Sequence, residues 1–174
     1  MGTDSYSGLS WVTEEMKNEL RKRDEIVAKE DMSALFKLKD NSDFSIALYE
    51  ILVNRFEKDS NALNPQQLNL FLCMHMENAG QADSILSFLQ EWFPEYQNRV
   101  VKSLKEIGAK KSSEIIEQAV SLLPKDGTWF YHSSNQESEN LMSKLDHDFS
   151  DYPDGSMRDL YRKYAEKYRK EIEK

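Results

Sequence analysis

The chain has 174 residues with a net charge of −8, and 39% of its residues are hydrophobic. This acidity argues against direct binding to nucleic acid, because the phosphate backbone selects basic surfaces. The one cysteine, Cys73, excludes an internal disulfide, and no stretch approaches the roughly 18 uninterrupted apolar residues of a membrane-spanning helix. We therefore expect a cytoplasmic protein with no membrane contact and no cofactor.

The N-terminal part of the chain divides into a polar start and a charged helix. Residues 1–12 are predicted to form a flexible N-terminus, and residues 13–174 a single helical domain. Only six glycines and four prolines interrupt the chain, which favours long helices over many short strands. Thr13 is the predicted N-cap of a helix over residues 14–29, because two glutamates follow it where the helix dipole favours negative charge.

The next predicted helix is the first with a strong apolar face. Between residues 44 and 56, apolar side chains recur at three- and four-residue spacing, which is typical of a helix packed against a core. Ser42 or Asp43 is the predicted N-cap. This helix is expected to be core.

A third helix has a clear start signal. Asn64 stands at the predicted cap, a proline follows at the first helical position, and Gln67 is placed to complete a capping box. We expect this helix to end in a turn at residues 78–80. A further apolar helix is predicted over residues 83–92, and Pro94 breaks it.

Residues 100–124 are predicted to form an αα-hairpin. One apolar stripe ends at Ile107, and Gly108 follows, where the chain can turn left-handed without a Cβ clash. A second stripe begins at Ile115 and is ended by Pro124. The predicted fold class is all-α, a single-domain bundle of about seven or eight helices around this central hairpin.

The C-terminal part begins with an aromatic run and continues into two further predicted helices. The aromatic run at residues 129–131 leaves open a short extended segment, although a single strand would have no partner. A helix is then predicted from the apolar spacing up to Phe149, and Ser156 caps the last helix. Tyrosines on that last helix are expected to bury their rings while their hydroxyl groups stay near water.

Several of these segments resemble the bacterial DNA-mimic-protein domain family. The likeness rests on Glu77-Asn78-Ala79-Gly80, on LKEIGAKK at 104–111, on EQAVSLLP at 117–124, and on shorter stretches at 145–149 and 159–164, and it covers about residues 60–170. Ala79 departs from the family pattern, which has a glycine there, and Gln81 stands where the pattern has an aromatic residue. Glu77, Asn78 and Gly80 are the residues assigned to the family-motif turn.

The resemblance implies a protein that imitates duplex DNA with surface carboxylates and occupies a DNA-binding regulator. Residues 137–154 hold six acidic residues against Lys144, a local charge of −5. Several carboxylates on one face would steer a basic partner at long range. The predicted partner-binding residues are therefore Glu137, Glu139, Asp146, Asp148, Asp151 and Asp154. The alternative for the same stretch is an ordinary solvated helix face.

No decisive catalytic or metal-binding motif occurs. Asp146, His147, Asp148 and Asp151 offer metal-ligand atoms, but the spacing lacks the glycine and terminal glutamate of a calcium-binding loop, so no metal site is predicted. Cys73 and His75 point to different faces of one helix.

Three functional hypotheses follow. The first is a non-enzymatic module that engages a basic or DNA-binding protein through acidic surface. The second is a structural or immunity-type protein that binds through apolar and aromatic surface, with self-association left open. The third is a hydrolase-like enzyme around His147.

Overall fold

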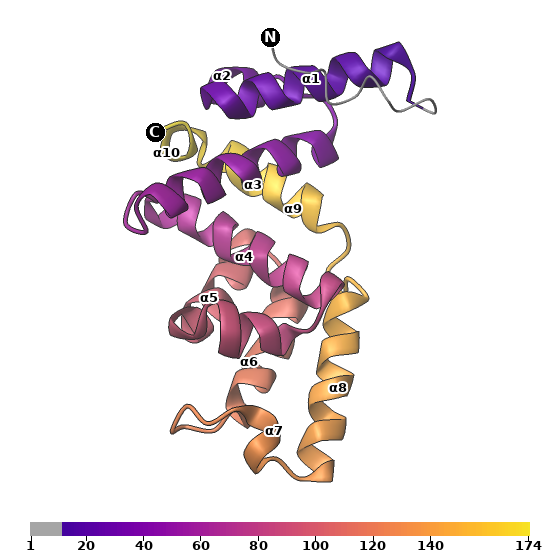
Figure 1. Cartoon of the computed structure of the whole chain (residues 1–174), viewed down its shortest axis with the longest axis vertical. Coiled ribbons are helices and arrows are strands. Elements are labelled where there is room, and N and C mark those ends of the chain that lie inside the picture. The colour runs from indigo at the N-terminus through magenta and orange to yellow at the C-terminus, as the bar shows by residue number, and fades with distance from the viewer. Residues whose placement is uncertain (1–11) are drawn as a thin grey trace.

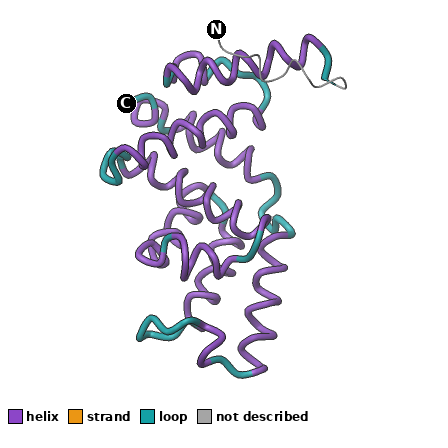
Figure 2. The backbone as a smooth tube through the Cα atoms, in the orientation of Figure 1, coloured by secondary structure: helices purple, strands orange, loops and turns teal. Residues whose placement is uncertain are grey.

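Every regular element in residues 12–174, the part of the chain that the structure describes, is helical (Figure 2). The structure is a computed structural model, and it has seven helices of at least seven residues. The predicted all-α class and the predicted number of helices are therefore confirmed. The predicted flexible segment 1–12 lies outside the described residues except for Val12, which is buried.

The helical elements follow one another with short connections. In chain order they are α1 (Glu14–Lys29), α2 (Met32–Leu35), α3 (Asn41–Lys58), α4 (Pro65–Ala82), the π-helix η1 (Ser87–Trp92), the 3₁₀-helix η2 (Pro94–Tyr96), α5 (Gln97–Ile107), α6 (Lys110–Leu122), α7 (Phe130–Ser133), α8 (Gln136–Ser150), α9 (Met157–Lys167) and α10 (Arg169–Ile172). No helix among the described residues is both long enough and apolar enough to cross a membrane.

The helices are arranged along one long axis (Figure 1). Helices α1 and α2 lie at one end, and α7 and the lower part of α8 lie at the other. After α8 the chain returns through α9, which packs against α3. Helix α4 is the element with the most neighbours, because it contacts α3, α5, α8, α10 and η1. The core therefore gathers around α4, with the predicted hairpin beside it.

The hairpin itself forms as predicted. Helices α5 and α6 pack against each other, and Gly108 between them is left-handed with φ +98°. The Gly108 N–H donates to the carbonyl oxygen of Lys105 at 3.1 Å, and the Ala109 N–H donates to Leu104 at 2.8 Å. These two bonds satisfy carbonyl groups at the end of α5, as a glycine C-cap does.

The sequence signals for helix starts are confirmed at Thr13 and Asn64. The Thr13 hydroxyl accepts the Met16 N–H at 3.2 Å, and Asn64 forms a capping box with Gln67. The predicted cap of α3 was wrong, because Asp40 occupies that position and accepts the N–H groups of residues 42 and 43. A carboxylate two or three residues upstream serves the free N–H groups equally well.

The predicted turn at residues 78–80 is wrong, because α4 continues to Ala82 and ends at Asp83. Glu77, Asn78 and Gly80 are therefore helical. Gly80 has a packing role, since a Cβ atom there would lie 2.8 Å from Cδ1 of Phe149 on α8. The missing side chain lets the two helices approach closely.

The aromatic run at 129–131 forms no extended segment, because Phe130 begins the one-turn helix α7. The Phe130 N–H donates to Oε1 of Gln90 at 2.9 Å, and its ring is buried. Tyrosine hydroxyl groups on α9 also differ from expectation. Tyr161 is 1% exposed and its hydroxyl group lies inside the protein, where polar partners take the place of water.

Candidate functional site

The six predicted partner-binding carboxylates fall into two groups, and the first group, Asp146 and Asp154, accepts backbone N–H groups. Oδ1 of Asp146 accepts the backbone N–H of Ile85 at 2.7 Å. The two oxygens of Asp154 accept the N–H groups of Lys111 and Ser112 at 3.0 and 2.7 Å, at the start of α6. These two carboxylates cap helical segments that are distant in sequence. Both half-buried carboxylates therefore have a role in holding the scaffold together.

Glu139 is also engaged, because its Oε1 accepts the Ser134 hydroxyl at 2.7 Å. Of the remaining three residues, Glu137 and Asp151 are exposed and Asp148 is half-buried, and they lie along α8 and just beyond it. Glu137 and Asp148 are eleven residues apart on the same side of the helix, about 16 Å along the axis at 1.5 Å per residue. The carboxylates of this second group therefore follow the length of α8.

A groove of about 310 Å³ between α6 and α8 adds one acidic residue. Glu114 of α6 lines it together with Asp148 and Asp151. Sequence reasoning missed Glu114, because nothing local shows that α6 lies beside α8. We call Glu114, Glu137, Asp148 and Asp151 the α6/α8 acidic face.

Two lysines interrupt the α6/α8 acidic face. Lys144 forms an ion pair with Asp148 one turn away, and Lys111 lines the groove. His147 Nε2 lies 3.4 Å from Oδ2 of Asp151, with both side chains largely exposed. Exposed pairs of this kind are weak, so a partner can break them at little cost in free energy and contact the carboxylates.

The residues considered for metal binding or catalysis do not converge. Within residues 12–174 no three His, Cys, Asp or Glu side chains form a metal-binding group. Cys73 is fully buried, and this burial raises the pKa of its thiol well above the ordinary value. His75 faces Tyr49, with 3.2 Å between its Nε2 and the tyrosine hydroxyl. This arrangement gives no activated nucleophile.

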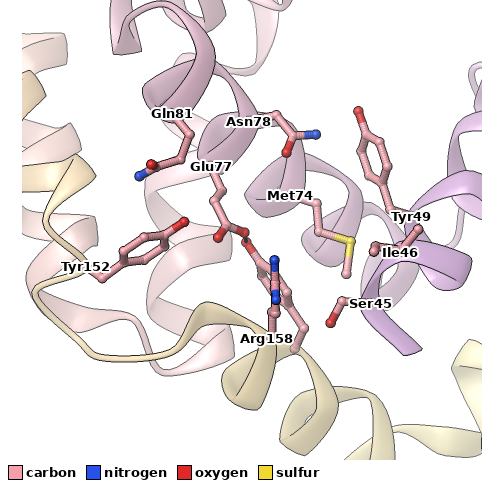
Figure 3. A pocket seen from close by; sticks show the side chains of 10 residues that line it. Ser45, Ile46, Tyr49, Met74, Glu77, Asn78, Gln81, Tyr152 and Arg158 are labelled. Atoms are coloured by element: carbon pink, nitrogen blue, oxygen red, sulfur yellow. Dashed lines mark hydrogen bonds between the residues drawn. The ribbon is translucent and has the colours of Figure 1, made fainter. Parts of the chain in front are cut away.

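A second concave feature lies where α3, α4 and α9 meet (Figure 3). This pocket has a volume of about 350 Å³. Its wall comes from α3, α4, the α8–α9 connection and α9, and comprises Ser45, Ile46, Tyr49, Met74, Glu77, Asn78, Gln81, Tyr152, Arg158 and Tyr161. We call it the Glu77 pocket. Two of the three family-motif residues, Glu77 and Asn78, therefore line a pocket, although not as a turn.

The Glu77 carboxylate is held by tyrosines. The Tyr161 hydroxyl lies 2.8 Å from Oε2 of Glu77 and 3.2 Å from the carbonyl oxygen of Cys73. Burial and the nearby Glu77 charge raise the pKa of Tyr152 to about 12. The same two causes raise the pKa of Tyr161 well above its usual range. Both phenols therefore stay protonated and available as hydrogen-bond donors at neutral pH.

Together the fold and these surfaces describe a helical protein with carboxylates along one outer helix and a polar pocket beside its central helix. A scan against family models matches residues 61–168 to the DMP19-like proteins, a family named after DNA mimic protein 19. The match covers more than half of the chain, so this chain belongs to the DMP19-like family. No match is found among curated proteins or among solved structures.

The matched range contains α4 to α9 and the whole α6/α8 acidic face, and it confirms the resemblance noted in the sequence. Helices α1 to α3 lie outside it. The Glu77 pocket therefore combines family residues on α4 and α9 with Ser45, Ile46 and Tyr49, which α3 supplies from outside the matched range.

Proposed function

We propose that this protein binds a DNA-binding protein through the α6/α8 acidic face and competes there with DNA. Membership of a family of DNA mimics is the observation that carries the proposal. The carboxylates of this face would attract the partner's basic surface, because salt weakens the attraction between exposed charges without abolishing it. The function is one of binding, with no chemical step.

The geometry supports a narrower acidic surface than the sequence alone. Asp146 and Asp154 are occupied by backbone N–H groups, so they are removed from the proposed contact. Glu114 joins it from α6. Electrostatic contacts of this kind act mainly on the association rate and on the choice of partner.

The competing hypothesis, binding through apolar and aromatic surface, is no longer supported by the tyrosines of the last helix. Tyr161 and Tyr164 on α9 are buried, and Tyr168 is half-buried with its ring against Tyr164. The tyrosine-rich helix therefore belongs to the core. Exposed apolar side chains do occur near the far end of the molecule, at Tyr131 and Leu141, and the salt response separates the two hypotheses.

The test begins with affinity capture from a lysate of the source cells. A retained protein counts only if it binds duplex DNA by itself and if that DNA displaces it from this chain. Because salt screens contacts between exposed charges, binding should fall steeply between about 50 mM and about 200 mM salt. Binding through apolar surface would change little over that range.

A matched pair of double variants locates the contact. Glu137→Gln with Asp151→Asn should weaken binding roughly tenfold, since two exposed charge contacts of up to about 1 kcal/mol each are lost and about 1.4 kcal/mol is tenfold. Glu15→Gln with Glu19→Gln removes two exposed charges from α1 at the other end of the molecule and should leave affinity nearly unchanged (Figure 1). Equal losses in both pairs would show a general charge effect and would refute this docking face.

Lys144 gives a test of opposite sign. Lys144→Gln removes a positive charge beside Asp148 on the α6/α8 acidic face. It should therefore tighten binding to a basic partner and increase the salt dependence. Weaker binding by this variant would contradict an electrostatic contact at α8.

A further inference from the structure

We propose that the Glu77 pocket binds a small zwitterion of the α-amino acid class, with the ligand ammonium group at Glu77 and its carboxylate at Arg158. This inference is independent of the proposed partner, because the pocket is lined by α3, α4 and α9, whereas the α6/α8 acidic face is not. Two charged side chains, one buried hydroxyl group and an apolar wall give the pocket the features that such a ligand needs.

The pocket carries opposite charges that do not pair with each other. Arg158 is exposed and forms no ion pair within the described part of the chain. Glu77 is half-buried and accepts the Tyr161 hydroxyl. In Figure 3 both charged side chains point into the space between Tyr152 and α3. A lone anion would be repelled by Glu77 and a lone cation by Arg158, whereas a zwitterion can neutralise both.

Ser45 adds a polar group with no use in the fold. Its residue is 7% exposed, and its Oγ is buried without a hydrogen-bond partner among the described residues. Buried hydroxyl groups are normally satisfied, because leaving one unpaired costs free energy. Ser45 lines the Glu77 pocket on the side of Arg158, where its hydroxyl group would donate a hydrogen bond to a ligand carboxylate (Figure 3).

The rest of the wall fits an amino acid with an apolar side chain. Ile46 and Met74 give apolar surface, and Asn78 and Gln81 of α4 add amide groups to the wall (Figure 3). The volume of about 350 Å³ lies within the usual range of small-molecule sites. Sites of this kind combine an apolar wall with a few polar groups that fix orientation.

The experiment is isothermal titration of the full chain with each of the common L-amino acids, and with acetate and methylammonium as single-charge probes. At least one amino acid should bind with a dissociation constant of about 1 mM or tighter. Acetate and methylammonium should each bind at least roughly tenfold more weakly, because each meets a like charge.

Three variants assign the contacts. Arg158→Gln and Glu77→Gln should each weaken binding roughly tenfold, as the loss of a charged hydrogen bond does. Ser45→Ala should weaken binding by about threefold, and it should raise the unfolding temperature of the ligand-free protein, because it removes an unsatisfied hydroxyl. Lys163→Gln on α9 and Glu91→Gln are the matched controls, since both side chains are exposed and neither lines the pocket.

Two results would overturn the inference. One is the absence of saturable binding for every amino acid up to about 10 mM. The other is binding that acetate or methylammonium reproduces, or that survives Arg158→Gln and Glu77→Gln unchanged in variants shown to be folded by circular dichroism. Failure of partner capture would leave these titrations unaffected.

Discussion

At the scale of single residues, Gly80 sets how closely α4 and α8 approach. A Cβ atom at this position would lie 2.8 and 3.0 Å from two ring carbons of Phe149, whose side chain is 4% exposed. The hydroxyl of Ser150 also donates to the Gly80 carbonyl oxygen at 2.8 Å, which ties the end of α8 to the same turn of α4. Space is therefore the constraint at Gly80, rather than backbone conformation.

Gly80→Ala should lower the free energy of unfolding by up to about 2 kcal/mol. Overpacking costs about 1–3 kcal/mol, and the gain in helix propensity of about 1 kcal/mol offsets part of it. Urea unfolding monitored by circular dichroism measures the change. Phe149→Leu frees space at the contact, so the double variant should be more stable than the sum of the single effects. Strict additivity would contradict the clash.

The burial of His75 couples stability to pH just below neutrality. Its imidazole ring packs against Phe71, with 4.2 Å between ring centroids, and against Phe93 at 4.9 Å. This burial lowers the pKa of His75 below the ordinary value of 6.5. The folded protein therefore holds the neutral form, while the unfolded chain takes up a proton as the pH falls through 6.5.

Stability should therefore decline as the pH falls from about 7 to about 5.5, since the unfolded state binds more protons in that window. His75→Phe keeps a ring at the site and removes the titrating group, so its stability should depend less on pH there. Urea unfolding at a series of pH values gives the slope. An unchanged slope in the variant would show that other groups cause it.

At the scale of elements, helix starts in this protein are capped both locally and at long range. Thr13 and Asn64 cap the helices that follow them directly. Asp154 instead reaches the start of α6, 42 residues away from Ser112. Asp146 reaches Ile85, 61 residues away. These long-range caps fix how α8 and the α8–α9 connection sit against their neighbours.

Asp154→Ala should destabilise the protein by about 1 kcal/mol, because it leaves two N–H groups of α6 without a side-chain acceptor. Asp151→Ala is the matched control, since Asp151 is exposed and its side chain lies against the exposed His147. It should cost less than about 0.5 kcal/mol. Thermal unfolding of both variants tests the difference, and equal losses would deny Asp154 a capping role.

At the scale of the whole molecule, α9 connects the N-terminal helices α1 to α3 to the part of the chain that matches the family model, residues 61–168. The Arg162 guanidinium donates to the carbonyl oxygens of Leu38 at 2.9 Å and Phe36 at 3.1 Å. It also lies 4.4 Å from the centroid of the Phe44 ring. One side chain of the matched range thus binds the connection between α2 and α3, which lies outside that range.

Arg162→Lys should destabilise the N-terminal helices by about 1–3 kcal/mol, since one ammonium group cannot replace two directed guanidinium contacts. Hydrogen exchange should therefore accelerate in α1 to α3 more than in α5 and α6. Lys163→Ala, next to it on α9 and exposed, is the control. A uniform acceleration over the whole chain would contradict this local role.

The sequence by itself determined the features that depend on neighbouring residues. The all-helical class, the caps at Thr13 and Asn64 and the turn at Gly108 arise within a few residues, where backbone geometry and capping act. The family also follows from the sequence, since its segments are read along the chain. The misplaced end of α4 shows the limit of this reasoning, because Gly80 serves helix packing instead of a turn.

Only the tertiary structure decided which carboxylates are free. Asp146, Asp151 and Asp154 look alike in sequence, yet packing turns two of them toward backbone N–H groups and leaves the third in solvent. The same is true of the Glu77 pocket, whose wall joins residues from 45 to 161. Such sites depend on which helix faces pack together. The apolar pattern shows which face of a helix is buried, but hydrophobic burial is non-directional, so the pattern does not show which other helix covers that face.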